Sequence, residues 1–211
     1  MSIEDEVIYT IKKARDIASA CREDIWAKAK EQNRDPKIYL HWTAGGYNTV
    51  YDSYHINIKG DGQVLYFDDD LGVYRPATYR RNSGSVSITL CCCVGGTTKD
   101  LGCNPPTPIQ IERMSQVVCG IAEGLWLTID KQHVLTHGEA ANNEDGFYAC
   151  EPYAVWSDPA PADGDTRWDL EFLGTDESPS YKPFDTTGVR GGDVLRGKAE
   201  WYRDKYLPLI D

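Results

Sequence analysis

Positive charge is scarce in this chain of 211 residues, where 22 Lys and Arg residues stand against 33 Asp and Glu residues and give a net charge of −11. Nucleic acids and anionic membranes are bound through a basic face that displaces counterions. No basic run in the sequence could form such a face. We therefore expect neither a nucleic-acid partner nor a membrane partner.

Long apolar runs and a disulfide pattern are also missing. No stretch approaches the roughly 20 apolar residues of a membrane span, and residues 1–6 lack the positive and apolar regions of a secretion signal. The seven cysteines are an odd number, and Cys91, Cys92 and Cys93 are adjacent. Because neighbouring strand residues point to opposite faces, small core residues are favoured here over a thiolate metal cluster. These absences predict a protein that is made in the cytoplasm, without disulfides.

Apolar periodicity predicts a helix at each end of the chain and one in the middle. Ser2 and Asp5 have the spacing of a helix cap, and residues 107–110 begin a second helix that reaches to about Ile129. A last helix, over 194–206, is expected to dock on the rest of the domain. The apolar stripe of the first helix, which should lie against a sheet, consists of Val7, Ile11, Ala14, Ala18, Cys21 and Ile25.

Runs of β-favouring residues separate these helices. Residues 53–58 and 63–67 flank a glycine-containing turn and predict a hairpin. Residues 37–41 and 132–139 predict two further strands, and 85–94 predicts a strand that is buried on both faces.

Two histidines stand at the ends of predicted strands. His41 is followed by a turn of small residues and His137 by a glycine, so each is either a hydrogen-bonded structural residue or a ligand at the lip of the sheet. His133 would lie roughly 13 Å from His137 on a strand and could not share a metal with it. A shared helix face, as in zinc proteases, would need a glutamate where Val134 stands.

A carboxylate further along the chain could complete a metal site. Asp169 offers a hard oxygen ligand, and Arg167 would project to the same side of an extended segment. Two histidines and a carboxylate leave the fourth position of tetrahedral zinc open, as a catalytic site requires. The structural alternative is an ion pair with an anchoring aromatic residue in the Arg-Trp-Asp triplet.

The order of these motifs resembles that of the type 2 zinc-dependent N-acetylmuramoyl-L-alanine amidases, a family that includes bacteriophage amidase lysozymes and peptidoglycan-recognition proteins. The matching pieces are a strand ending in His-x-Thr-Ala, a Tyr-His-x-x-Ile hairpin with a Gly-Asp-Gly turn, an Asn-x-x-Ser-Val-x-Ile strand, a helix and a Thr-His strand end. The resemblance implies a single-domain α/β fold with a central mixed sheet flanked by helices, and we expect the protein to be a monomer. Within it we expect an N-terminal helix (1–36), an amidase core (37–173) and a C-terminal extension (174–211).

The resemblance also implies a site and an activity. Zn2+ would be bound by His41, His137 and Asp169, and the enzyme would hydrolyse the amide bond between N-acetylmuramic acid and L-alanine in peptidoglycan or a muropeptide. Tyr54 would assist at the zinc water, and Arg167 would take the place of a lysine or other donor. Two other functions remain open: a recognition module that binds peptidoglycan without cutting it, and a zinc peptidase or amidase for another amide.

The chain departs from the family at the catalytic base. Members that use a glutamate carry it on the central strand, where this chain has Thr89, and Tyr79 stands near a position that is often histidine. Glu139, two residues after His137, is a hypothetical substitute base. The chain is also unusually long between His137 and Asp169.

The biological setting follows from the missing secretion signal and from the lack of a recognisable wall-binding repeat. We expect a phage lysin or an autolysin that acts on the cell wall after release. The alternative is a cytoplasmic enzyme that recycles wall fragments.

Overall fold

One five-stranded sheet forms the centre of the computed structural model, which describes residues 2–96, 100–147, 169–179 and 189–210. The strand order is β3-β2-β4-β1-β5, and only β3 runs antiparallel to its neighbour. The strands are β1 (Lys37–Trp42), β2 (Ile56–Ile58), β3 (Val64–Tyr66), β4 (Ser85–Leu90) and β5 (Val134–Thr136). The predicted α/β domain with a central mixed sheet is confirmed.

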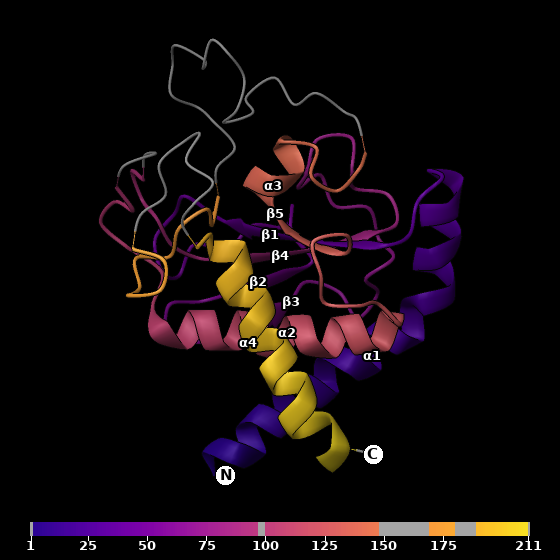
Figure 1. Ribbon diagram of the computed structural model, residues 1–211, viewed down its shortest axis with the longest axis horizontal. Coiled ribbons are helices and arrows are strands. Elements are labelled where there is room, and N and C mark those ends of the chain that lie inside the picture. Colours follow the sequence, from indigo (N-terminus) through magenta and orange to yellow (C-terminus); the bar gives the residue numbers. More distant parts are fainter. Residues whose placement is uncertain (1, 97–99, 148–168, 180–188, 211) are drawn as a thin grey trace.

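The helices are α1 (Ile3–Glu31), α2 (Pro108–Leu125), α3 (His137–Ala141) and α4 (Gly191–Tyr206), and a 3-10 turn, η1 (Leu207–Leu209), follows α4. Figure 1 shows α4 crossing over α2. Helices α1 and α2 approach closely because α2 carries a glycine at their contact: a Cβ at Gly124 would come within 2.6 Å of the Ala18 Cβ. Among the described residues, no helix is long and apolar enough to cross a membrane.

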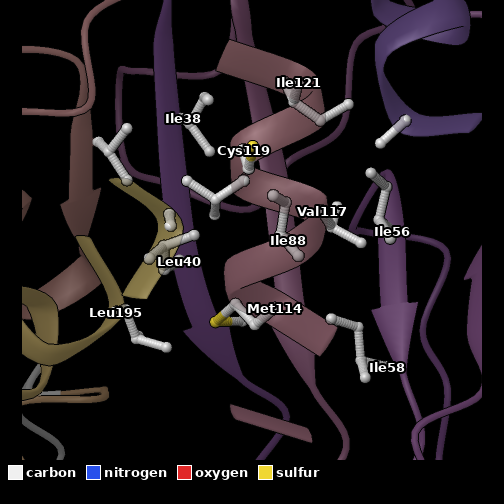
Figure 2. Packing of buried hydrophobic residues seen from close by; sticks show 14 of the residues in the cluster. Ile38, Leu40, Ile56, Ile58, Ile88, Met114, Val117, Cys119, Ile121 and Leu195 are labelled. Atoms are coloured by element: carbon white, nitrogen blue, oxygen red, sulfur yellow. The ribbon is translucent and has the colours of Figure 1, made fainter. Parts of the chain in front are cut away.

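The two faces of the sheet differ in chemistry because apolar and polar residues alternate along its strands. Ile38 and Leu40 of β1 and Ile88 of β4 pack against α2, where Met114 and Val117 meet them (Figure 2). The residues between them point to the other face and are all buried: Tyr39, His41, Ser85, Ser87, Thr89 and Asn57. The prediction that the β4 strand is buried on both faces is therefore confirmed, and one of those faces is polar.

Several details differ from the sequence-based expectations. The apolar stripe of α1 packs chiefly on α2 and not on the sheet, since Ala14 and Ala18 of the stripe lie against Gly120 and Gly124 of α2. Helix α2 ends at Leu125 instead of near Ile129, because Trp126 takes a left-handed conformation with φ 60°. Strand β4 ends at Leu90, before the three adjacent cysteines, which are buried as predicted. His137 begins α3 instead of ending a strand, since Thr136 caps that helix.

Candidate functional site

Parallel strand pairing brings the two predicted histidine ligands together. In β1, Leu40 is in register with Thr136 of β5, so His41 and His137 each follow one member of that pair. His41 is itself in register with Thr89 of β4. The carboxyl ends of parallel strands meet at one edge of a sheet, and ligands of open α/β sheets usually bind at that edge.

Asp169 lies against both histidines. The Nδ1 atoms of His41 and His137 are 3.1 Å apart. Oδ2 of Asp169 is 3.5 Å from Nδ1 of His41 and 3.4 Å from Nδ1 of His137. These three residues are the only group of three or more His, Cys, Asp or Glu side chains in the described part of the chain that could hold a metal ion.

The triangle formed by these atoms has the size that a tetrahedral metal site requires. Zinc lies about 2.0–2.1 Å from imidazole nitrogen and about 2.0–2.2 Å from carboxylate oxygen, so two of its ligand atoms are separated by about 3.3–3.4 Å. The three distances here lie close to that separation. Imidazole and carboxylate ligands suit zinc, and three protein ligands leave one position for a substrate or water.

The electrostatics of the site favour an ionised carboxylate. Burial raises the pKa of Asp169, but the charges and hydrogen bonds of His137 and His41 oppose burial and hold that pKa well below its usual range. Asp169 therefore offers a negative oxygen to a cation at neutral pH.

His41 is also held from its other side, because its Nε2 lies 3.1 Å from Oγ1 of Thr78. A histidine that binds a metal through Nδ1 carries its proton on Nε2, and such a proton is usually donated to a fixed acceptor. Thr78 is buried, and its backbone N–H donates to Oδ1 of Asn82 at 2.7 Å. Thr78 can therefore fix both the ring orientation and the tautomer of His41.

The loop that carries Thr78 is anchored by a buried ion pair. Arg81 is completely buried and donates through Nε to Oδ2 of Asp145 at 2.7 Å. Tyr39 donates its hydroxyl to the same oxygen, also at 2.7 Å, and Arg81 donates to the carbonyl of Phe147. The sequence alone did not single out Thr78 or Arg81; the adjacent Arg80, Arg81 and Asn82 were a signal for a buried or paired arginine, but not for Thr78.

A cavity of about 750 Å³ opens beside the three candidate ligands, with His137 and Asp169 on its wall. Aromatic side chains form much of the wall, namely Trp42, Tyr54, Tyr74 and Tyr79, and Arg80 adds a cation. The Tyr54 ring centroid lies 5.1 Å from that of His41, so the tyrosine predicted to assist in catalysis borders the site. Arg167, the other predicted donor, lies outside the described residues.

Glu139 does not face this cavity, and the structure gives it a different role from that of a base. The side chain is completely buried, and its Oε2 accepts hydrogen bonds from the Thr136 backbone N–H at 2.9 Å and from Arg196 Nη1 at 2.8 Å. Its other oxygen accepts from Arg196 Nη2. These contacts cap α3 and join it to α4, which leaves the carboxylate fully engaged.

Comparison with known proteins finds no matching family model and no matching curated protein sequence. Among solved structures, the chain is similar to Drosophila PGRP-LB, with 15% identity over 50% of this chain and 71% of the other and a TM-score of 0.37. It is also similar to LysCS, an N-acetylmuramoyl-L-alanine amidase endolysin from Clostridium intestinale, with 16% identity, 51% and 72% coverage and a TM-score of 0.36. A tyrosine-to-phenylalanine mutant of PGRP-LB in complex with tracheal cytotoxin is similar as well, with 16% identity over 49% of this chain and 70% of the other and a TM-score of 0.35. Likeness of this degree assigns no function.

Proposed function

We propose that this protein is a zinc-dependent amidase that hydrolyses the bond between N-acetylmuramic acid and L-alanine in peptidoglycan. The observation that carries the proposal is the triangle of His41 Nδ1, His137 Nδ1 and Asp169 Oδ2, which has the dimensions of three corners of a zinc tetrahedron. The motif order from Lys37 to Asp169, which resembles that of the type 2 amidases, supports this choice of substrate.

The chemistry divides between the ion and the surrounding side chains. A bound zinc ion polarises a scissile carbonyl and lowers the pKa of water toward about 7. Tyr54 borders the ligands and would donate its phenol O–H to the oxyanion that develops on the carbonyl oxygen. Arg167 is proposed as a second donor, from its position two residues before Asp169.

The cavity suits a substrate that is part sugar and part peptide. Its volume of about 750 Å³ falls within the range of small-molecule sites. Aromatic walls can stack on the apolar faces of a sugar ring or on an alanine methyl, and Arg80 can pair with a carboxylate of the peptide. The walls therefore offer partners to both halves of the molecule that would be cut.

The test is to incubate the purified protein with cell-wall peptidoglycan, with and without a zinc chelator, and to measure new L-alanine amino termini and new reducing sugar ends. Amino termini that appear only without chelator, and no sugar ends, are the expected result. Release of neither product by zinc-loaded protein that still sediments with the wall would identify a recognition module instead.

A second experiment tests whether the protein acts on the intact cell wall or on soluble wall fragments. Intact wall and soluble muropeptide are offered in parallel, and the initial rates are compared. A lysin or autolysin that acts on the wall after release should cleave the polymer at least as fast as the fragment. Strong preference for the soluble fragment would indicate a cytoplasmic recycling enzyme.

A further inference from the structure

A second concave site lies between α4 and α2, where the two helices cross (Figure 1). It is a slot of about 450 Å³, lined by Glu112, Gly197, Lys198, Trp201 and Tyr202. Both helices pack on the apolar face of the sheet, whereas His41 points to the polar face. The slot is therefore separate from the candidate zinc site.

Trp201 supplies a large apolar wall that is 53% exposed. Lys205, one turn further along α4, places its ammonium 4.8 Å from the centroid of the indole, and the Tyr202 ring meets the indole edge-on at 5.0 Å. The indole is thus held by its neighbours although much of its surface remains open. A held aromatic ring in a slot can stack on a flat ligand with little loss of side-chain entropy.

Gly197 lies one turn before Trp201 and also lines the slot. A Cβ at this position would meet no atom within 4 Å, so packing does not require a glycine there. Glycine inside a helix costs about 0.5–1 kcal/mol relative to alanine. The absence of a side chain at position 197 keeps the slot open beside the indole. A ligand that occupies this space would explain why the helix has a glycine there.

Polar groups border the slot on the α2 side. Glu112 accepts hydrogen bonds from Lys198 Nζ at 2.8 Å and from the Tyr202 hydroxyl at 2.7 Å, and Gln116 donates to that hydroxyl at 2.9 Å. Each carboxylate oxygen retains a lone pair, and the ammonium retains donors. An apolar wall next to such a pair of charged groups matches a pyranose ring, which has an apolar C–H face and hydroxyls along its edge.

We propose that this slot binds a saccharide ring, stacked on Trp201 with its hydroxyls hydrogen-bonded to Glu112 and Lys198. The proposed function supplies the source, which is the glycan strand of the same polymer, so that the wall would be held at one site and cut at another. A nucleotide could also stack on the indole, but it would bring phosphate next to the Glu112 carboxylate of a chain with net charge −11.

The experiment is a calorimetric titration in which a β-1,4-linked tetramer of N-acetylglucosamine is added to chelator-treated protein and the heat of binding is measured. Because the protein is metal-free, the result is independent of whether the amidase activity exists. Binding should weaken at least tenfold in Trp201→Ala and in Gly197→Gln, whose side chain fills the slot. Trp126→Ala removes an indole that is 73% exposed at the end of α2, outside the slot, and should leave the affinity unchanged.

Several results would overturn the saccharide assignment. The first is that millimolar tetramer does not bind. The second is that Trp126→Ala and Trp201→Ala lose the same amount of affinity for the tetramer, and the third is that adenosine monophosphate binds while the tetramer does not. Circular dichroism and thermal unfolding of each variant separate a local effect from misfolding. Gly197→Ala serves as the folding reference, because its methyl group enters open space.

Discussion

The Nδ1 atoms of His41 and His137 face each other at 3.1 Å, and a single carboxylate oxygen of Asp169 lies within 3.5 Å of both. Two neutral imidazoles can approach in this way only if one carries its proton on Nδ1 and donates it, or if a cation lies between them. The second arrangement uses all three side chains as ligands. It also explains why Thr78 contacts Nε2 of His41, the atom that would then carry the proton.

Removing the carboxylate ligand should remove the metal. Asp169→Ala is expected to lose bound zinc and peptidoglycan cleavage together, because two imidazoles alone bind the ion weakly. Zinc content by mass spectrometry after dialysis is the measurement. Asp16→Ala, which alters an exposed carboxylate on α1, is the matched control. Full zinc retention in Asp169→Ala would show that Asp169 is not a ligand.

Removing one hydroxyl should separate binding of the metal from catalysis. Tyr54→Phe keeps the ring that lies beside His41 but loses the phenol donor. We expect kcat to fall about a hundredfold or more, the usual effect of losing an oxyanion donor, with zinc content unchanged. An unaltered kcat would exclude Tyr54 from the reaction, and loss of zinc would give it a structural role instead.

Thr78 should act on the metal through His41. Thr78→Val keeps the shape of the side chain but removes the acceptor for Nε2. Zinc affinity should fall about 10–100-fold, as is typical when the partner of a ligating histidine is lost. Competition with a chromogenic chelator measures the affinity. Thr78→Ser retains a hydroxyl and should recover most of it, so equal losses in both variants would contradict this role.

Breaking the buried ion pair behind the loop should destabilise the fold. Both side chains of the Arg81–Asp145 pair have no exposed surface, and Asp145→Ala would leave the guanidinium without its carboxylate. The free energy of unfolding should fall by about 3–5 kcal/mol, as measured by urea denaturation. The exposed Lys12–Asp16 pair gives the comparison, and Asp16→Ala should cost less than about 1 kcal/mol.

His55 should make stability depend on pH. Its Nε2–H donates to the Val73 carbonyl, and its Nδ1 accepts from the Ser87 N–H, which requires a neutral ring. Burial lowers the pKa of His55 to about 4 from an ordinary 6.5. The unfolded chain therefore binds more protons between these values, so stability rises with pH across this window and is lost as pH falls through it.

The size of this effect follows from the width of the window and is about 3 kcal/mol. Urea denaturation between pH 4 and 7 measures it. His55→Gln, which cannot ionise, should flatten the pH dependence by that amount. If the free energy of unfolding depended on pH in the same way in the unmodified protein and in His55→Gln, a group other than His55 would cause the dependence.

The sequence predicted those parts of the molecule that depend on neighbouring residues. Ser2 and Asp5 do form a capping box. The pairing of His41 with His137 was expected only from the family resemblance, because it depends on parallel strands that carry distant residues to one edge. The Thr-x-x-Glu spacing from Thr136 to Glu139 is that of a helix cap, and it could have indicated the capping contact that Glu139 makes in α3. Thr78 could not be predicted, since its contact with His41 depends on the path of a loop that no local pattern specifies.

His41 lies in β1, His137 begins α3, and Asp169 lies two residues before Glu171. The carbonyl of Glu171 accepts a hydrogen bond from the backbone N–H of Gly191, the first residue of α4, so the segment that carries Asp169 is tied to α4. An ion held by all three would fasten distant parts of the chain to each other and bind only the folded state. At a free zinc concentration a hundred times the dissociation constant, this linkage adds about 2.7 kcal/mol to the free energy of unfolding. The metal would then add to the stability of the folded protein as well as supply its chemistry, and a zinc-poor environment would weaken both together.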